Sequence, residues 1–284
     1  MSGQLLDGKA IAKEIRAEVK EEVAALRAQG IAPKMAVILV GDDPASVYYA
    51  QSKEKAANNV GIDFDFHNLP TDTKESDLLA LIEKLNQDKG AHGIMVELPL
   101  PGQISTDKVM EAVLPAKDVD GIHPMNRGYI LSNGPGLFPA TPQSCIELML
   151  RSGVEIEGKH AVIVGRGETV GKPLVFLLLQ HNPTITICHS RTKDLASFVK
   201  QGDIVIAAVG RPNMITKEMV KPGAIVVDAG INEVEGGGYC GDVDFEGLKE
   251  VVSLISPVPG GVGSLTTSLI FKNLLKGISI QQSK

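Results

Sequence analysis

The stretch HAVIVGRGETVGKP, residues 160–173, decides the fold of this 284-residue chain. An apolar run typical of a buried β-strand leads into Gly165, Gly167 and Gly171, and Pro173 stands near the first turn of the helix that should follow. Glycines let the backbone approach a diphosphate closely, and the N–H groups at a helix start attract anions. The spacing, G-x-G-x-x-x-G, is one residue longer than the usual dinucleotide fingerprint, and a glycine-rich turn that binds nothing is the alternative. A P-loop is excluded because Pro173 follows the Gly-Lys pair where a P-loop has Ser or Thr.

The next predicted strand, TITICHS at 184–190, ends where a dinucleotide-binding fold normally carries an acid that binds the ribose. Ser190 and Arg191 stand there instead, and Arg166 lies in the glycine-rich stretch. Two guanidiniums and a hydroxyl suit a 2′-phosphate, so the sequence favours NADP over NAD, although a single Arg is more often an exposed solubilising charge. Open parallel sheets bind ligands at their carboxyl edge. Two further strand ends are expected along that edge: Val209-Gly210 and Gly230-Ile231.

Strand and helix patterns alternate along nearly the whole chain. Continuous apolar runs, typical of parallel strands buried on both faces, occur at 35–41, 160–165, 203–210 and 224–230. Strands are also expected near 63–67 and 93–98, helices at about 8–30, 44–58, 75–87, 106–113, 144–153 and 265–277, and a loop or linker at 115–142. The alternation predicts right-handed βαβ units, and therefore an α/β fold with parallel sheets.

Composition limits the function classes. The chain has 34 acidic and 28 basic residues, a net charge of −6, and no Trp. Nucleic acid is therefore not expected as a partner, although a local pocket for a small anion is compatible with this balance. The cysteines, Cys145, Cys188 and Cys240, form no CxxC pair, which argues against a disulfide framework or zinc cluster and fits a reducing cytoplasm. The apolar runs are too short to span a membrane, and the N-terminus has no signal-like core.

Reactive side chains are also candidates in the first half of the chain. Tyr49 and Lys53 are four residues apart on a predicted helix and so share one face. A Lys beside a Tyr can polarise water if the amine is desolvated. The ordinary alternatives are a solvated Lys, a packing Tyr and, for Asp120 in KDVDG, a turn-forming side chain. His123 and His189 are more often loop hydrogen-bonders than ligands, and no metal spacing links them.

Six strings occur in order: SVYYAQSKEKAANNVGI (46–62), VELPLPG (96–102), KDVDGIHP (117–124), VGRGETVGKP (164–173), CHSRT (188–192) and PVPGGVGSLT (257–266). Together they resemble the bifunctional methylenetetrahydrofolate dehydrogenase/methenyltetrahydrofolate cyclohydrolase family over essentially the whole chain. The resemblance implies an α/β folate domain at 1–140 and 265–284 and a Rossmann-like NADP domain at 141–264, with the active site in the cleft. It also implies that the last helix packs onto the first domain, and that a homodimer forms through the Rossmann-like domain.

The resemblance implies roles for individual residues. Lys53 matches the catalytic lysine, Tyr49 the tyrosine that stacks near the pterin, and Asp120 the carboxylate that hydrogen-bonds the pterin's amino-pyrimidine edge. The loop that closes over the substrate matches Pro259, Gly260 and Gly261. The cofactor-contacting positions match Gly165, Arg166, Gly167, Ser190 and Ile231, to which the predicted sheet edge adds Gly171, Arg191, Val209 and Gly210.

The implied chemistry has two steps. A hydride passes from the methylene bridge of methylenetetrahydrofolate to the nicotinamide, and water then attacks the resulting methenyl cation to give formyltetrahydrofolate. The first step needs mainly alignment, and the second needs proton management, which Lys53 is suited to supply. Such one-carbon interconversion supplies purine, methionine and histidine biosynthesis.

Three positions depart from the family pattern. Glu97 stands where the family usually has Gln, and a carboxylate beside Lys53 would favour the ammonium over the free amine, so Glu97 joins the candidate catalytic residues. Gly167 removes a phosphate-binding hydroxyl, which softens the NADP preference, and Ser264-Leu265 replaces Pro-Met. Two other functions stay open on the residues alone: a dehydrogenase of another small substrate, which would not need Tyr49, Lys53 and Asp120, and a folate-binding protein without turnover.

Overall fold

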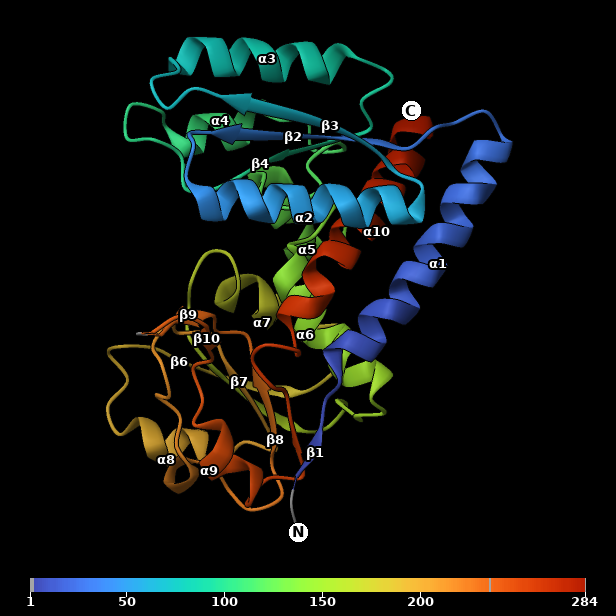
Figure 1. Ribbon diagram of the computed structural model, residues 1–284. Coiled ribbons are helices and arrows are strands. Elements are labelled where there is room, and N and C mark those ends of the chain that lie inside the picture. Colours follow the sequence, from blue (N-terminus) through green and yellow to red (C-terminus); the bar gives the residue numbers. More distant parts are fainter. Residues whose placement is uncertain (1–2, 235, 284) are drawn as a thin grey trace. The chain divides into compact units, whose positions relative to one another are not determined.

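The computed structural model describes residues 3–234 and 236–283, and the chain forms two compact units (Figure 1). The Rossmann-like unit comprises Met1–Glu14 and Pro139–Thr266, and the three-stranded unit comprises Ile15–Phe138 and Thr267–Lys284. A two-domain α/β fold is thus confirmed. Residues 3–14 were expected with the folate domain, at 1–140, but they group with the Rossmann-like unit. The reason is β1 (Gln4–Leu5), which pairs in parallel with β11 (Leu254–Ile255).

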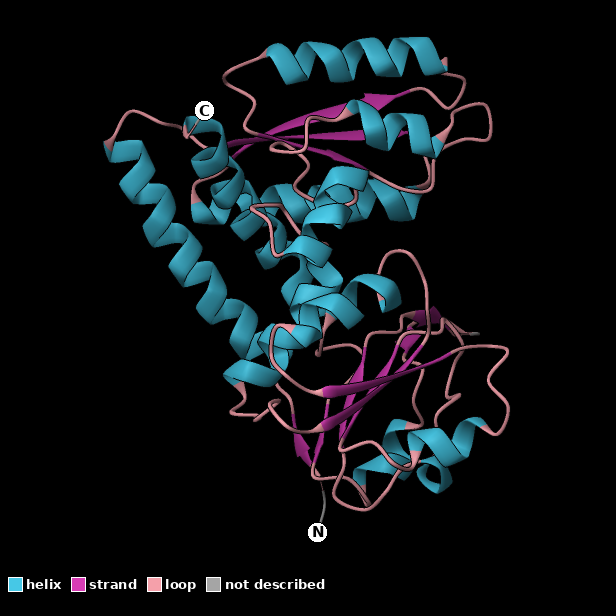
Figure 2. Cartoon of the chain, turned by 180° about the vertical axis from the view of Figure 1, so that it is seen from behind, coloured by secondary structure: helices cyan, strands magenta, loops and turns pink. Residues whose placement is uncertain are grey.

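The Rossmann-like unit is built on a six-stranded parallel sheet in the order β1-β11-β8-β7-β5-β6. Its main strands are β5 (His160–Val164), β6 (Thr184–Cys188), β7 (Ile204–Ala207) and β8 (Ile225–Asp228). Helices lie on both faces of this sheet (Figure 2). They are α6 (Ala140–Arg151), α7 (Gly171–Leu179), α8 (Leu195–Val199) and α9 (Phe245–Lys249), with a 3₁₀ turn η1 at Lys217–Met219. Double coverage explains why the strands read as continuous apolar runs.

The order of the strands fixes the place of a ligand. β5 has β6 on one side and β7 on the other, so the connections that follow β5 and β6 run in opposite directions across the sheet. In open α/β sheets, ligands bind beyond the carboxyl ends of the strands at such a switch point. The glycine-rich stretch follows β5, and so lies at this point. A short antiparallel pair, β9 (Asn232–Glu233) with β10 (Tyr239–Cys240), was not predicted.

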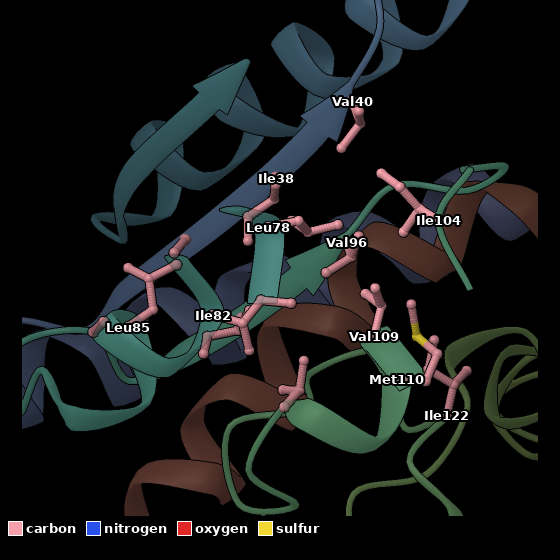
Figure 3. Close-up of a cluster of buried hydrophobic side chains, with 14 residues drawn as sticks. Ile38, Val40, Leu78, Ile82, Leu85, Val96, Ile104, Val109, Met110 and Ile122 are labelled. Atoms are coloured by element: carbon pink, nitrogen blue, oxygen red, sulfur yellow. The ribbon is translucent and has the colours of Figure 1, made fainter. Parts of the chain in front are cut away.

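The three-stranded unit has a parallel sheet in the order β3-β2-β4. Its strands are β2 (Lys34–Val40), β3 (Asp63–Leu69) and β4 (Gly93–Val96). α2 (Pro44–Val60) covers one face, and α3 (Glu75–Gln87) and α4 (Thr106–Ala112) cover the other (Figure 1). Ile38 and Val96 of the sheet pack against Leu78, Ile82 and Val109 of these two helices (Figure 3). This buried layer holds the carboxyl ends of β2 and β4 in fixed positions.

Three further helices are α1 (Gly8–Ala28), α5 (Pro124–Ser132) and α10 (Gly263–Gln282). α5 corrects the expected loop at 115–142: Pro124 takes the first helical position, and the His123 ring accepts a hydrogen bond from the Met125 N–H at 2.9 Å. The sequence PMNRGYILS has too weak an apolar period to show this helix in advance. Among the described residues, no helix is both long and apolar enough to cross a membrane.

Candidate active site

Lys53 and Glu97 form an ion pair in the three-stranded unit. Lys53 Nζ lies 2.6 Å from Glu97 Oε1 and 2.9 Å from Oε2, and the side chains are only 15% and 12% exposed. Lys53 stands on α2, and Glu97 is the first residue after β4, where its backbone N–H still donates to Ile38 O at 2.8 Å. Sequence analysis considered a carboxylate beside Lys53 only as a condition, and the structure gives the separation of the two groups. Low exposure protects this pair from solvent screening.

Tyr49 and Lys53 share one face of α2 because they are four residues apart on this helix. Asp43 caps the helix by accepting a hydrogen bond from the Ser46 N–H at 2.9 Å, and Pro44 takes the first position, as predicted. The helix ends at Val60 on a left-handed Gly61. Tyr49 therefore lies one turn before Lys53. It is 45% exposed, and its ring lies edge-on to the Tyr48 ring, with 6.1 Å between the ring centroids.

Asp120 lies within electrostatic reach of this pair. Burial raises its pKa to about 6; the Asp118 charge adds to this shift, the Lys53 charge opposes it, and the Glu97 charge raises it again. A carboxylate with a strongly raised pKa beside a lysine and a second carboxylate is typical of functional sites. Sequence analysis expected Tyr49, Lys53, Glu97 and Asp120 in one site, and the structure places all four in one unit.

The residue that shapes the Asp120 loop is one that sequence analysis missed. Asp118 is buried, and it accepts hydrogen bonds from the Gly121 N–H (3.1 Å), the His123 N–H (2.8 Å) and Asn126 Nδ2 (2.8 Å). The turn-forming role considered for Asp120 therefore belongs to Asp118. The sequence KDVDG has carboxylates at two alternate positions, 118 and 120, which could have indicated this role. It does not show which of the two is buried and accepts the hydrogen bonds of the loop.

The glycine-rich stretch forms a close turn between β5 and α7. Gly165 has φ of 126°, and a Cβ at this position would lie 2.0 Å from Ala208 O. A Cβ on Gly171 would lie 2.3 Å from Gly165 O, whereas one on Gly167 would meet no atom within 4 Å. The first and last glycines are thus required by packing, and Gly167 borders open space at the start of α7. That open cradle fits a dinucleotide diphosphate.

Charged residues surround this turn. Arg166, Ser190 and Arg191 are exposed, the last two directly beyond β6. The His189 ring accepts a hydrogen bond from the Arg191 N–H at 3.1 Å, so His189 orders this loop, as its ordinary interpretation predicted. Glu168, the acid within the turn, is paired with Lys172. Positive charge from Arg166 and Arg191 is therefore available to an anionic ligand.

The other predicted cofactor and substrate positions also lie in the Rossmann-like unit. Ile231 follows β8 and is 60% exposed. The N–H groups of Val209 and Gly210 donate to the buried Asp242 carboxylate, and so point into the protein. The loop carrying Pro259, Gly260 and Gly261 follows β11, so the structure divides the predicted substrate residues between the two units.

These features define a class of protein. A doubly wound parallel sheet with a close glycine turn at its switch point is a dinucleotide-binding fold, and the second unit carries a nearly buried lysine–carboxylate site. The class is therefore a two-domain, dinucleotide-dependent α/β enzyme.

Comparison with known proteins identifies the family. Residues 6–120 match the tetrahydrofolate dehydrogenase/cyclohydrolase catalytic domain, and residues 139–282 match the NAD(P)-binding domain of the same enzymes. The chain is 67% identical to "Bifunctional protein FolD 2" of Desulfitobacterium hafniense over 281 residues, which is 99% of both chains. It is 63% identical to a bifunctional protein FolD of Heliobacterium modesticaldum, again over 281 residues, with 99% of this chain and 98% of the relative covered.

Comparison with solved structures identifies the same family. The bifunctional FolD methylenetetrahydrofolate dehydrogenase/cyclohydrolase of Campylobacter jejuni superposes with a TM-score of 0.96 at 43% identity, covering 99% of this chain and 100% of that one. The Trypanosoma brucei enzyme complexed with NADP and an inhibitor gives 0.93 at 35% identity, with both chains fully covered. The chain belongs to the tetrahydrofolate dehydrogenase/cyclohydrolase family. It is a bifunctional enzyme that oxidises 5,10-methylenetetrahydrofolate with NADP and hydrolyses the methenyl product to 10-formyltetrahydrofolate.

Proposed function

We propose that Lys53, Glu97, Asp120 and Tyr49 form the folate-reacting centre, and that the three-stranded unit is the folate domain. One observation carries this assignment: the 2.6 Å Lys53–Glu97 ion pair, with Asp120 close enough for both charges to act on it. An ion pair of this kind, with each side chain less than one-sixth exposed, is an unusual place for a lysine without a chemical role.

In the oxidation step, the chain's residues act mainly by alignment. NADP, when bound, accepts the hydride from the methylene carbon. The Asp120 carboxylate binds the N–H groups of the amino-pyrimidine edge, and the Tyr49 ring lies against the flat pterin. The folate nitrogens stabilise the product cation themselves, so a base is not required at this step.

The hydrolysis step needs proton transfer. Water adds to the methenyl carbon, one of its protons goes to the ring nitrogen whose bond to that carbon breaks, and the other is released. Lys53 Nζ and Glu97 Oε1 are 2.6 Å apart, so the pair can take a proton at one atom and return it from the other. Since the ammonium has three N–H donors and Glu97 engages two, one remains to orient the water or the departing nitrogen.

The Rossmann-like unit supplies the cofactor site in this proposal. Gly165, Arg166, Gly167 and Gly171 receive the diphosphate, and Ser190 and Arg191 bind the 2′-phosphate with Arg166. Val209, Gly210 and Ile231 line the same edge through side chains and carbonyl groups. Pro259, Gly260 and Gly261 form a loop over the substrate.

We also infer a homodimer that forms through the Rossmann-like unit. In the described part of the chain, β6 pairs with β5 alone, so its outer edge is open to a second strand. Ile187 of β6, with Phe176 and Leu179 of the preceding helix α7, is 37–50% exposed. Three free thiols, Cys145, Cys188 and Cys240, support a reducing cytoplasmic location.

The test follows the absorbance of the methenyl group after methylenetetrahydrofolate and NADP are added. The proposal expects methenyl formation and its decay to the formyl product. A dehydrogenase for another substrate would give no methenyl signal, whereas a binding protein would retain folate without any change. Methenyltetrahydrofolate that forms but decays no faster than its uncatalysed hydrolysis would still support the oxidation. That result would overturn the role in hydrolysis given to Lys53 and Glu97.

A further inference from the structure

A buried carboxylate that the reaction does not touch holds two of the cofactor-site loops. Asp242 is 0% exposed, and its two oxygens accept four hydrogen bonds. Oδ2 receives the N–H groups of Val209 (2.6 Å) and Gly210 (3.0 Å), and Oδ1 receives the Arg211 N–H and Asn232 Nδ2, both at 2.9 Å.

Three successive backbone N–H groups that converge on one point form the kind of concavity that binds anions in proteins. At the turn after β7 this concavity holds the protein's own carboxylate. The remaining bond, from Asn232, attaches the segment after β8 to the same group. Asp242 therefore joins two neighbouring strand ends along the carboxyl edge of the sheet.

A second buried carboxylate fixes Asp242 in place. Asp228, the last residue of β8, accepts hydrogen bonds from the N–H groups of Gly230 (2.9 Å), Asp242 (3.0 Å) and Val243 (3.0 Å). The two acids are packed without spare room. A Cβ on Gly241 would lie 1.8 Å from Asp228 Oδ2, and one on Gly230 would lie 2.2 Å from Asp242 Cγ.

We propose that Asp242 is a positioning residue for NADP: it sets the place of Val209–Arg211 and of Ile231, the neighbour of Asn232, and so controls cofactor affinity without contacting the cofactor. The proposal rests on the assignment of Val209, Gly210 and Ile231 to the cofactor site made above. It separates the two activities, because hydrolysis of methenyltetrahydrofolate requires no NADP.

The variant that tests this is Asp242→Asn, which keeps the size of the side chain. An amide presents one acceptor oxygen and one donor nitrogen, so at least one backbone N–H loses its partner and faces another donor. NADP binding is measured by calorimetry without folate, and cyclohydrolase activity is measured from methenyltetrahydrofolate without NADP. We expect NADP affinity to fall about tenfold, with cyclohydrolase activity retained within about twofold.

Asp244→Asn is the matched control. Its carboxylate lies two residues away and caps α9 by accepting the Gly247 N–H at 3.2 Å. The substitution makes the same Asp-to-Asn change at a position where the Asn oxygen can still accept that one hydrogen bond. This control should bind NADP as the wild type does. An unchanged NADP affinity in Asp242→Asn would overturn the proposal, as would an equal loss of NADP binding and cyclohydrolase activity.

If Asp242→Asn fails to fold, Asn232→Ala provides the same test, because it removes one of the four bonds and leaves the backbone contacts intact. NADP affinity should then fall about two- to fivefold, again with cyclohydrolase unchanged, and an unaltered affinity rejects the proposal. Failure of the wild-type chain to bind NADP would instead reject the underlying cofactor-site assignment.

Discussion

At the scale of single residues, we expect the hydrolysis to depend most on the Lys53 side chain. Lys53→Met keeps the length of the side chain but removes every proton that it can donate or accept. We expect cyclohydrolase activity to fall by about 10²- to 10⁴-fold, with NADP affinity unchanged. Lys20→Met, on the exposed face of α1, is the control for loss of one positive charge. Normal hydrolysis of methenyltetrahydrofolate by Lys53→Met would remove this residue from the mechanism.

Glu97 holds the Lys53 side chain in place. Its two carboxylate oxygens lie 2.6 and 2.9 Å from Lys53 Nζ. Glu97→Leu removes both acceptors, so we expect it to lower cyclohydrolase activity about 10²-fold and to leave NADP affinity unchanged.

Glu97→Gln is the control, because the amide keeps one acceptor oxygen for Lys53 Nζ. It should lose less cyclohydrolase activity than Glu97→Leu. Rates measured from methenyltetrahydrofolate at constant ionic strength give the comparison, and full activity in Glu97→Leu would show that hydrolysis does not need the ion pair.

We expect the ionised Asp120 carboxylate to lower the stability of the fold and to raise the affinity for the substrate. Its pKa in the folded protein, about 6, lies above the ordinary 3.8, so ionisation destabilises the fold progressively as pH rises from about 4 to 6. Asp120→Asn should therefore be more stable than wild type at pH 7.5, by up to about 3 kcal/mol, and equal to it near pH 4. Denaturant titrations at the two pH values measure this difference.

We expect the same ionisation to control substrate binding, because an ionised carboxylate offers two acceptor oxygens to the pterin N–H groups, whereas the protonated acid carries a donor on one of them. The wild-type KM for folate should rise as pH falls below about 6, whereas that of Asp120→Asn should be high and nearly independent of pH. A pH-independent wild-type KM would show that Asp120 does not contact the substrate.

At the scale of elements, we expect the turn after β5 and the end of β6 to determine the choice between NADP and NAD. Arg166 and Arg191 are exposed beside the open glycine turn, and no acid stands at the ribose position. Replacing both with Ala should raise the KM for NADP about tenfold or more and leave that for NAD nearly unchanged, since only NADP carries the 2′-phosphate. Initial rates with each cofactor give the comparison. An equal rise in the KM values for NADP and NAD would show that Arg166 and Arg191 do not bind the 2′-phosphate.

Elements with a strong period were predictable from sequence, and elements that depend on tertiary contacts were not. The β5–α7 turn and the capped start of α2 follow from local chemistry, in Gly165 and in Asp43-Pro44. β1 is two residues long and exists because β11 pairs with it. α5 depends on Asn126, which is buried and bonded to Asp118, a contact that the local pattern does not contain.

The candidate site shows the same division. Tyr49 and Lys53 share a face by helical spacing alone, and Asp120 was found through the family resemblance. Spacing does not show that Glu97, 44 residues from Lys53, reaches it, because this depends on β4 pairing with β2, against which α2 packs. The roles of Asp118 and Asp242 were also hidden, since each is defined by the backbone N–H groups that a folded loop directs at it.

At the scale of the whole molecule, the open edge of β6 predicts pairing of two copies. Ile187→Lys places a charge on this edge strand, where it opposes edge-to-edge pairing. We expect sedimentation of the wild type as a dimer and a shift toward monomer in Ile187→Lys. Glu157→Lys, on an exposed position of the same unit, controls for the change in charge. An unchanged dimer dissociation constant in Ile187→Lys would show that the interface does not include the edge of β6.

The last long helix has a consequence for how the protein is made. In α10, Asn273 donates to the carbonyls of Val119 and Phe138, and Gln281 donates to those of His92 and Ala116. Ribosomes add residues from the N-terminal side, so Ile15–Phe138 of the three-stranded unit is made before residues 139–266, and α10 is completed last. The segment 139–266 leaves the ribosome in between and can fold while synthesis continues. Until α10 follows, the nascent folate half exposes the apolar surface that this helix will cover, which makes that interval the one in which a chaperone or a protease has access.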